Sequence, residues 1–419
     1  MKYCSAGESH GPALITIVSD VPAGFILTSA MINSDLKRRQ SGYGRGGRMK
    51  IEHDKVEILS GLRFSKTLGT PIALKIVNRD WENWTELMAQ EGEAPQGLKL
   101  EQSPRPGHGD LVGALKTDTR DCRDILERAS ARETAVRVAA GAVAKAWLSN
   151  FGVEIASYVT RIGDVEMPFS EISRNDAVFM ADSIEASPVR CPDELASAQM
   201  VAAIDAARDA GESLGGWFMV TATGLVPGIG GYAEAKDRLT GRIGGALLSI
   251  PAIKGIEFGL GFAAGTLLGS QVHDPIIYAD EPGTFDRSDE PGAFGYPDEA
   301  DAFGRSDEVG AFGRFRRTSN HAGGLEGGMT TGEPLVIRAV MKPIPTMTKP
   351  LQTIDLTTHK SVEASKERSD ICAVPAAAVV GEAELALVLA DAYMDKFGRD
   401  SLTDAMQSFT SYVSRISTR

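Results

Sequence analysis

Residues 131–150, ARETAVRVAAGAVAKAWLSN, indicate the fold more clearly than any other stretch of the chain. Apolar residues at positions 135, 139, 142, 143 and 146 repeat with the period of an amphipathic helix, so we predict a helix over this whole range. Ser130 and Glu133 have the spacing of a capping box at its start, and Gly152 supplies its end. A helix this rich in alanine is expected to pack closely against its neighbours.

The segments on either side of this helix predict a mixed fold. Further helices are predicted over 192–210 and 379–396, and residues 48–61 alternate like a half-buried strand. Two more strand-like runs cover 216–228 and 333–343. Because helices and strands do not alternate regularly, the fold class predicted is α+β and not a doubly wound parallel sheet.

The composition is that of a large folded protein without a membrane span. The 419 residues are 42% hydrophobic, which allows one large domain or two smaller ones. No run of eighteen apolar residues or secretory signal is present, so we expect a cytoplasmic protein. Four widely spaced cysteines favour reduced thiols over a zinc site or a disulfide framework.

The net charge of −12 is unevenly spread. Residues 280–315 form four acidic nonapeptides with ten Asp or Glu and three Arg, a net charge of −7. We interpret them as a duplicated acidic surface loop; a lid or partner-binding segment is the alternative. A dense cluster of basic residues lies elsewhere in the chain, and in an acidic protein such a cluster suits a small anionic ligand better than a nucleic acid. It consists of Lys37, Arg38, Arg39, Arg45, Arg48 and Lys50.

Three short motifs match well-known signatures outside their usual context. Residues 7–11, GESHG, match the nucleophile elbow of serine hydrolases, but Gly11-Pro12 follows where a helix is needed. Residues 42–47, GYGRGG, match a dinucleotide fingerprint but lead into a predicted strand, and no long helix follows Gly259-Leu260-Gly261. The glycines of 42–47 more plausibly let the backbone approach a ligand.

Three other segments offer groups for binding and proton transfer. His108 lies in the turn RPGHGD with an acid two residues on, and Asp370 follows a cation in ERSD. Residues 127–133, ERASARE, open the predicted helix with a hydroxyl and two arginines, which is a natural site for an anion or a cofactor phosphate.

Taken in order, these motifs resemble the chorismate synthase family. The resemblance covers the chain apart from residues 280–315, and its last motif looks most like the actinobacterial branch. The motifs that carry it are GESHG, RRQSGYGRGGRM, RPGHGD, ERASARETAVRVAAG, SNHAGGLEGGMTTGEP, MKPIPTMTKP and ERSDICAVPAAAVVGEA. The resemblance implies a 1,4-anti elimination of phosphate from 5-enolpyruvylshikimate 3-phosphate, giving chorismate. It also implies a need for reduced FMN without net redox change.

The resemblance also implies roles for individual residues. His10 would protonate the departing phosphate, His108 would protonate or polarise the flavin, and Asp370 would help to remove the ring proton. Arg48 and Arg132 would bind substrate. The positions that would bind cofactor, or NADPH where a family member uses it, are Arg39, Arg45, Arg128, Ala129, Ser130, Pro251, Ala252, Gly327, Lys342, Pro343, Ile344, Pro345, Thr346 and Arg368.

The family fold implied is a β-α-β sandwich, with helices between two antiparallel sheets, in a homotetramer. We expect one domain over 1–419, with 280–315 inserted in it.

Pro251 stands where a polar residue is expected beside the flavin, and Leu260 where an Asp is expected. The sequence leaves open whether the protein reduces its own flavin or depends on an external flavin reductase, with NADPH as an indirect reductant. A nicotinamide-dependent oxidoreductase and a catalytically silent binding protein are the alternatives.

Overall fold

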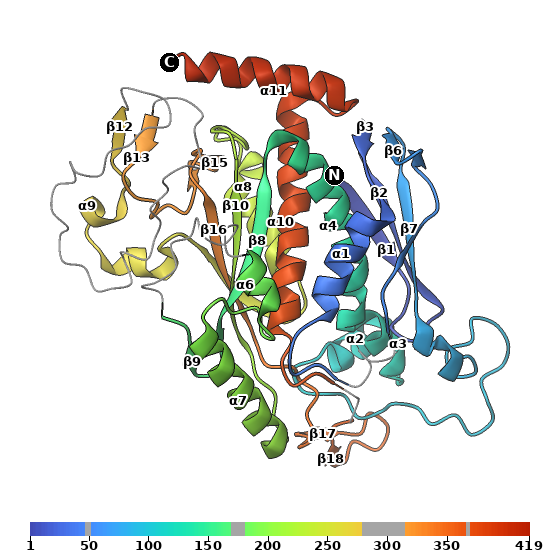
Figure 1. Cartoon of the computed structure of the whole chain (residues 1–419). Helices are drawn as coiled ribbons and strands as arrows, with labels where there is room; N and C mark the ends of the chain where they lie inside the picture. Colours follow the sequence, from blue (N-terminus) through green and yellow to red (C-terminus); the bar gives the residue numbers. More distant parts are fainter. Residues whose placement is uncertain (47–51, 169–180, 279–314, 366–368) are drawn as a thin grey trace.

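Two antiparallel sheets form the outer layers of the molecule (Figure 1). The computed structural model describes residues 1–46, 52–168, 181–278, 315–365 and 369–419. The strands of the two sheets are β1 Lys2–Ala6, β2 Ala13–Ser19, β4 Val56–Ile58, β7 Ile72–Val77, β8 Glu154–Ile162, β9 Val165–Glu166, β10 Gly216–Thr223, β11 Ile253–Phe258 and β16 Leu335–Met341. One sheet has the order β1-β2-β7-β4 and the other β11-β16-β10-β8-β9, and every pairing is antiparallel.

Helices fill the space between the sheets. They are α1 Ser29–Gln40, α4 Thr134–Leu148, α8 Leu239–Leu248 and α10 Val374–Phe397, and Figure 1 shows α10, α4 and α1 between β8 and β10 on one side and β2 and β7 on the other. The predicted α+β sandwich, with helices between two antiparallel sheets, is confirmed.

Shorter elements surround this sandwich. The remaining helices are α2 Asp110–Thr117, α3 Arg123–Ala129, α6 Ala181–Ala186, α7 Glu194–Ala210, α9 Gly269–Val272 and α11 Leu402–Ser417. The remaining strands are β3 Ala23–Ile26, β5 Leu62–Arg63, β6 Lys66–Leu68, β12 Ile276–Tyr278, β13 Phe315–Arg317, β14 Leu325–Glu326, β15 Met329–Thr330, β17 Gln352–Ile354 and β18 Ser361–Glu363.

The central helix α10 is apolar on nearly every side, which is why it lies between the two sheets. Leu385 and Leu389 are fully buried, and such a side chain contributes about 1.5–3 kcal/mol on leaving water. The helix crosses α4 closely: a Cβ added at Gly141 would lie 2.3 Å from the Cβ of Ala383. We therefore expect any larger residue at position 141 to push these two helices apart.

The helix predicted over 131–150 begins later than expected. A 3-10 turn, Ala131–Glu133, comes first, and α4 starts at Thr134. Ser130 caps that turn by accepting a hydrogen bond from the Arg132 N–H, whereas the carboxylate of Glu133 pairs with Arg137. The predicted capping box was therefore wrong, because Glu133 points along the helix to Arg137 and does not reach back to Ser130.

The strand predicted over 48–61 was also wrong over most of its described part, since residues 48–51 lie outside the described residues. In the described part, 52–61, only Val56–Ile58 pairs with a sheet. Side chains of α1 satisfy the backbone before it: Gln40 bonds the carbonyl of Glu52 and the N–H of Asp54, at 3.0 and 2.9 Å. The alternating pattern of this segment comes from the buried carboxylates of Glu52 and Asp54, and not from pairing with a neighbouring strand.

The other predicted elements fit more closely. Helix α7 ends at Gly211, which has a positive φ of 74°, as expected for a helix end. Helix α10 begins at Val374, five residues before the predicted start, because Pro375 is well tolerated in a first turn. Both strand-like runs form strands, β10 and β16.

Among the described residues, none of the helices is long and apolar enough to cross a membrane. Apart from its last residue, the acidic segment 280–315 lies outside the described residues.

Candidate active site

A cavity of about 370 Å³ lies at the end of the sandwich where α1 and α3 end and α10 begins. Turns far apart in the sequence meet there. The described residues that line it are Ser9, His10, Arg39, Arg45, Gly46, Asp80, Trp84, Arg105, Gly107, His108, Gly109, Leu126, Ala129, Ser130, Ala131, Arg132, Pro251, Ala252, Met341, Lys342, Ile344, Pro345, Thr346, Ser369, Asp370 and Ala373.

Most of the residues singled out in the sequence line this one cavity. All three proposed proton-handling residues are there, with eleven of the proposed binding residues: Arg39, Arg45, Ala129, Ser130, Arg132, Pro251, Ala252, Lys342, Ile344, Pro345 and Thr346. Arg128, Gly327 and Pro343 do not line it. The guanidinium of Arg128 instead donates to the carbonyls of Ser5 and Gly7. Arg48 and Arg368 lie outside the described residues.

His10 is held by a carboxylate at two points. Its Nδ1 lies 2.8 Å from Oε1 of Glu127, and its backbone N–H donates to Oε2 at 2.7 Å. The ring of Trp84 stacks on the imidazole with centroids 4.0 Å apart. Burial alone would raise the pKa of Glu127, but the hydrogen bonds from His10 and Arg123 outweigh burial and lower it. An ionised Glu127 accepts a hydrogen bond, so we assign the hydrogen to Nδ1 of His10.

His108 is also paired with a carboxylate, but this one is shared. Its Nδ1 lies 2.5 Å from Oδ1 of Asp110, which is fully buried in the first turn of α2. Arg105 donates to the same carboxylate through Nε at 2.8 Å, Nη2 at 3.1 Å and its backbone N–H at 3.0 Å. Burial would raise the pKa of Asp110, but His108 and Arg105 together hold that pKa well below its usual range.

Asp370 reaches the cavity from the segment before α10. Its Oδ1 accepts a hydrogen bond of 2.6 Å from the N–H of Gly46, and its Oδ2 lies 3.2 Å from Nε of Arg45. A Cβ at Gly46 would lie 2.8 Å from the carbonyl oxygen of Ser369. Glycine at 46 thus makes room for the protein backbone beside Asp370, and it also lines the cavity.

Two arginines share one buried carboxylate behind the cavity wall. Asp54 pairs with Nη1 of Arg132 at 2.7 Å and with Nη1 of Arg39 at 3.3 Å. Burial lowers the pKa of Arg39 to about 10, with Arg132 acting in the same direction and Asp54 against it. Among the described residues, Nη2 of the buried Arg132 has no hydrogen-bond partner. Nη2 of Arg132 also lies 3.8 Å from Oε2 of the buried Glu52, so two guanidiniums and two buried carboxylates stand behind this wall.

The lining as a whole is positive. Its described residues include five cations, Arg39, Arg45, Arg105, Arg132 and Lys342, against two carboxylates, Asp80 and Asp370. Apolar residues occupy part of the wall, among them Leu126, Pro251, Ile344 and Pro345. A cavity with excess positive charge and apolar patches is suited to a ligand that carries several anionic groups and a flat or hydrophobic part.

Sequence reasoning missed the partners that hold these histidines. Glu127, Trp84 and Arg105 were not proposed as functional, although they contact His10 and His108 directly. A signal existed only for Asp110, two residues after His108. Glu127 lies 117 positions from His10, so sequence spacing could not indicate the pair.

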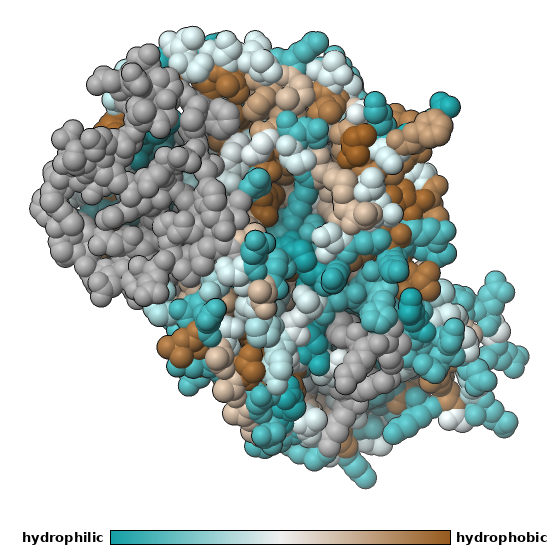
Figure 2. Space-filling model, viewed as in Figure 1, coloured by the Kyte–Doolittle hydropathy of each residue, from teal (hydrophilic) through white to brown (hydrophobic). Residues whose placement is uncertain are grey.

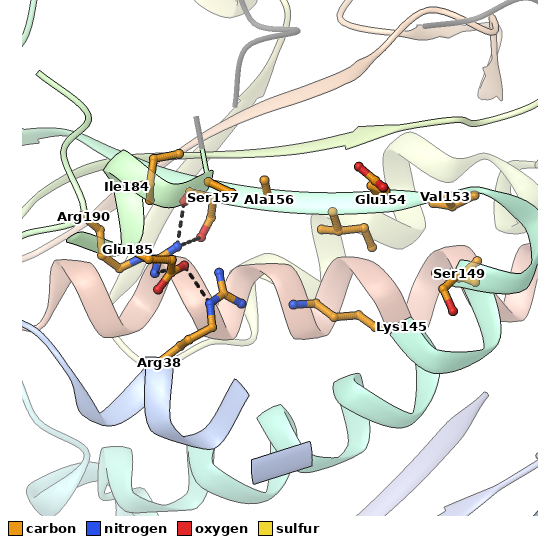
Figure 3. Close-up of a pocket in the computed structure, with 13 residues that line it drawn as sticks. Arg38, Lys145, Ser149, Val153, Glu154, Ala156, Ser157, Ile184, Glu185 and Arg190 are labelled. Atoms are coloured by element: carbon orange, nitrogen blue, oxygen red, sulfur yellow. Dashed lines mark hydrogen bonds and ion pairs between the residues drawn. The ribbon is translucent and has the colours of Figure 1, made fainter. Parts of the chain in front are cut away.

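A second cavity, of about 380 Å³, lies between α1, α4, β8 and α6 (Figure 3). Its cations are already paired: Arg38 binds both oxygens of the fully buried Glu382, at 2.7 and 2.8 Å, and Lys145 binds one at 2.5 Å. Figure 3 shows Arg190 joined to Ser157 and Glu185, and Arg38 joined to Glu185. Figure 2 shows hydrophilic residues gathered over this part of the surface. This cavity contains none of the proposed site residues.

In the first cavity two carboxylate-bound histidines face a cationic lining, an arrangement typical of an enzyme's active site. The comparisons with known proteins agree. The sequence model of chorismate synthase matches residues 1–394. Chorismate synthases of Symbiobacterium thermophilum and Bacillus subtilis are 49% and 46% identical, covering 100% and 96% of this chain and the same shares of their own. The chain belongs to the chorismate synthase family.

A solved structure gives the same result for the fold. A crystal structure of chorismate synthase superposes with a TM-score of 0.75 at 38% identity, covering 100% of this chain and 98% of its own. The relationship to the actinobacterial branch stays a prediction.

Proposed function

We propose that this protein converts 5-enolpyruvylshikimate 3-phosphate to chorismate by 1,4-anti elimination of phosphate, as a carbon–oxygen lyase that requires reduced FMN. The observation that carries the proposal is the meeting of His10, His108 and Asp370 at one strongly cationic cavity. The substrate carries two carboxylates and a phosphate, which are the groups that such a lining attracts.

The arginines support binding of the substrate's anionic groups. Arg39 and Arg132 are anchored by Asp54, so they present fixed donors to a ligand and lose little freedom on binding it. Nη2 of Arg132 makes no hydrogen bond among the described residues and lies 3.8 Å from Oε2 of Glu52, so it can still donate to an anionic group. Arg48, which also belongs to this proposed substrate set, lies outside the described residues.

The residues of the opposite wall fit a flavin. Pro251, Ala252, Ile344 and Pro345 offer an apolar surface to a flat ring, and Ala129 and Ser130 offer the end of α3. We propose that these residues, with Lys342 and Thr346 of the same lining, hold reduced FMN. The other positions in the proposed cofactor set are Arg128, Gly327 and Pro343, which do not line this cavity, and Arg368, which lies outside the described residues. When bound, reduced flavin supplies the electron density that weakens the carbon–oxygen bond, without net redox change.

The chain's own groups then handle the protons. His10, with its Nδ1 hydrogen directed to Glu127, would give a proton from Nε2 to the departing phosphate. His108, fixed by Asp110 and Arg105, would hold a proton on the flavin side of the cavity. Asp370, placed by Gly46 and Arg45, would take up the proton lost from the ring.

We also propose a homotetramer in the cytoplasm. The outer face of the first sheet supports self-association, because Ile15 and Ile17 of β2 are 40% and 47% exposed and Val77 of β7 is 51% exposed. On this face Ile15 is paired with Ala6 and Lys75, and Ile17 with Cys4 and Ala73. An apolar sheet face of this kind marks an interface more often than a solvent surface. An external flavin reductase remains part of the proposal as the source of reduced FMN, with NADPH as the indirect reductant.

One anaerobic experiment tests the reaction. The protein is mixed with 5-enolpyruvylshikimate 3-phosphate and chemically reduced FMN, and chorismate is followed by its absorbance. Product formation with no net oxidation of FMN is expected. The absence of product with reduced flavin would contradict the proposal, and net hydride transfer from a nicotinamide would favour an oxidoreductase instead.

A further inference from the structure

We propose that Glu127 is a positioning residue that supplies the counter-charge of a protonated His10 and fixes its ring so that Nε2 carries the mobile proton. The proposal rests on the proposed function, because it concerns how His10 acts as an acid. The other histidine, His108, also contacts a carboxylate, Asp110, but that carboxylate is shared with Arg105.

Glu127 contacts His10 through both of its carboxylate oxygens, whereas its other described side-chain partner, Arg123, contacts one. Its side chain is about 1% exposed, and its two oxygens face Nδ1 and the backbone N–H of His10. A ring rotation that brought Nε2 to the carboxylate would move the ring away from Trp84, which stacks on it at 4.0 Å with an interplanar angle of 29°. The orientation of the ring is thus fixed by one carboxylate, one backbone bond and one aromatic face.

The charges around His10 leave Glu127 able to balance an imidazolium. The cation facing Glu127 is Arg123, which makes a single contact of 3.3 Å to Oε1 and also lies over Trp84 at 5.1 Å. By contrast, Asp110 receives three hydrogen bonds from Arg105, so its charge is already matched. The other charged groups that face His10 across the cavity are Arg39, Arg45, Arg105, Arg132, Lys342, Asp80, Asp370 and His108. Most of these are cations, whereas Glu127 is the carboxylate in direct contact with the ring of His10.

Labelling of the histidines with diethylpyrocarbonate tests this without flavin or substrate. The reagent acylates only neutral imidazole, and peptide mass spectrometry separates His10 from His108. The ratio of the labelling rates at about pH 6 and about pH 8.5 cancels differences in access to the ring. In Glu127→Gln, which keeps the size and an acceptor, we expect the ratio for His10 to rise about threefold or more, because an adjacent carboxylate favours the charged ring.

The matched control is Asp110→Asn, in which the ratio for His10 is expected to change less than twofold because Asp110 contacts His108 and Arg105 and not His10. Glu127→Asp restores a charge and should return the ratio for His10 toward that of the unmodified protein. Circular dichroism verifies that each variant is folded. An unchanged ratio for His10 in Glu127→Gln overturns the proposal, and so does an equal change in Glu127→Asp.

Activity gives a second, separable readout. With reduced FMN, Glu127→Gln should lower kcat more than it raises KM, and the alkaline limb of the kcat profile should move to lower pH. If the unmodified protein forms no chorismate, the proposed function fails while the labelling result still stands. If it forms chorismate and the labelling ratios do not differ, only the role of Glu127 fails.

Discussion

Arg38 and Arg39 are neighbours in the sequence, yet they belong to two charged regions that work in opposite ways. Arg38 points to Glu382 and is bound by carboxylates on three sides, whereas Arg39 faces the active-site cavity and shares Asp54 with Arg132. Charges in the Glu382 cluster are satisfied within the protein. Cations of the cavity also have carboxylate partners, but the described lining carries five cations against two carboxylates, which favours an anionic ligand.

The difference shows that buried charge has two uses in this fold. The Glu382 cluster joins α1, α4, α10 and β8, because Arg38, Lys145 and Ser157 all bond to one carboxylate on the central helix. The cavity keeps its cations on turns and helix ends, where a substrate can reach them. We therefore expect substitutions in the first region to change stability and substitutions in the second to change catalysis.

The largest effect expected is on catalysis, from His10→Ala and His108→Ala. Each removes a proton-handling group, which contributes about 10²- to 10⁴-fold to rates of this kind. We expect kcat to fall by that factor with KM changed little, and the urea unfolding midpoint to stay the same. A rise in KM alone would mean that these histidines only bind ligand. A large loss of stability would break the separation between the two regions.

The next effect is on stability, from Glu382→Ala. Three cations would lose their shared buried partner, and breaking a buried ion pair typically costs about 3–5 kcal/mol. Urea unfolding followed by circular dichroism should show that loss. Glu185→Ala is the matched control: its side chain is 38% exposed and also contacts Arg38, so we expect less than about 1 kcal/mol. Equal losses in the two variants would mean that Glu382 does not join the helices.

The sequence could predict the general fold and most of the cavity, but not the division between these two regions. The spacing of residues 131–150 indicated the helix, because burial requires a repeating apolar face. The dense basic cluster indicated an anion site, yet nothing in it distinguished Arg38 from Arg39. That distinction depends on Glu382 and Asp54, and Glu382 lies 344 positions from Arg38. Glu127 and Trp84 could not be assigned for the same reason: their contacts exist only after folding.

A smaller effect is expected from exchanging arginine for lysine in each region. Arg45→Lys keeps the charge beside Asp370 but loses the planar donor set, so we expect KM to rise about tenfold, with the free energy of unfolding unchanged. Arg38→Lys should do the reverse and lower the free energy of unfolding by about 1–3 kcal/mol, because it cannot bind both oxygens of Glu382. Steady-state kinetics and urea unfolding on both variants measure the two quantities. A KM change in Arg38→Lys would show that the regions are coupled.

The smallest effect is a difference in acid sensitivity that isolates Glu382. Burial would raise the pKa of Glu382, but the cations of Lys145, Arg38 and Arg190 outweigh it and hold the pKa well below the ordinary value of 4.5. Below that ordinary value the unfolded chain binds a proton that the folded chain does not, so the stability from this carboxylate is present above pH 4.5 and decreases as the pH falls. Glu382→Gln removes this dependence.

Between about pH 6 and about pH 3.5, the unmodified protein should therefore lose about 1 kcal/mol more than Glu382→Gln does. Urea unfolding at each pH gives the comparison. Other carboxylates with lowered pKa values, such as Asp110 and Glu127, are present in both proteins and cancel in the difference. Lys145→Met keeps the carboxylate of Glu382 and removes one of its cations. Its loss of unfolding free energy over this pH range should therefore fall between those of the unmodified protein and Glu382→Gln. Parallel curves for all three proteins would mean that the charge of Glu382 contributes nothing to the pH dependence, and the cluster would then stabilise the fold by packing alone.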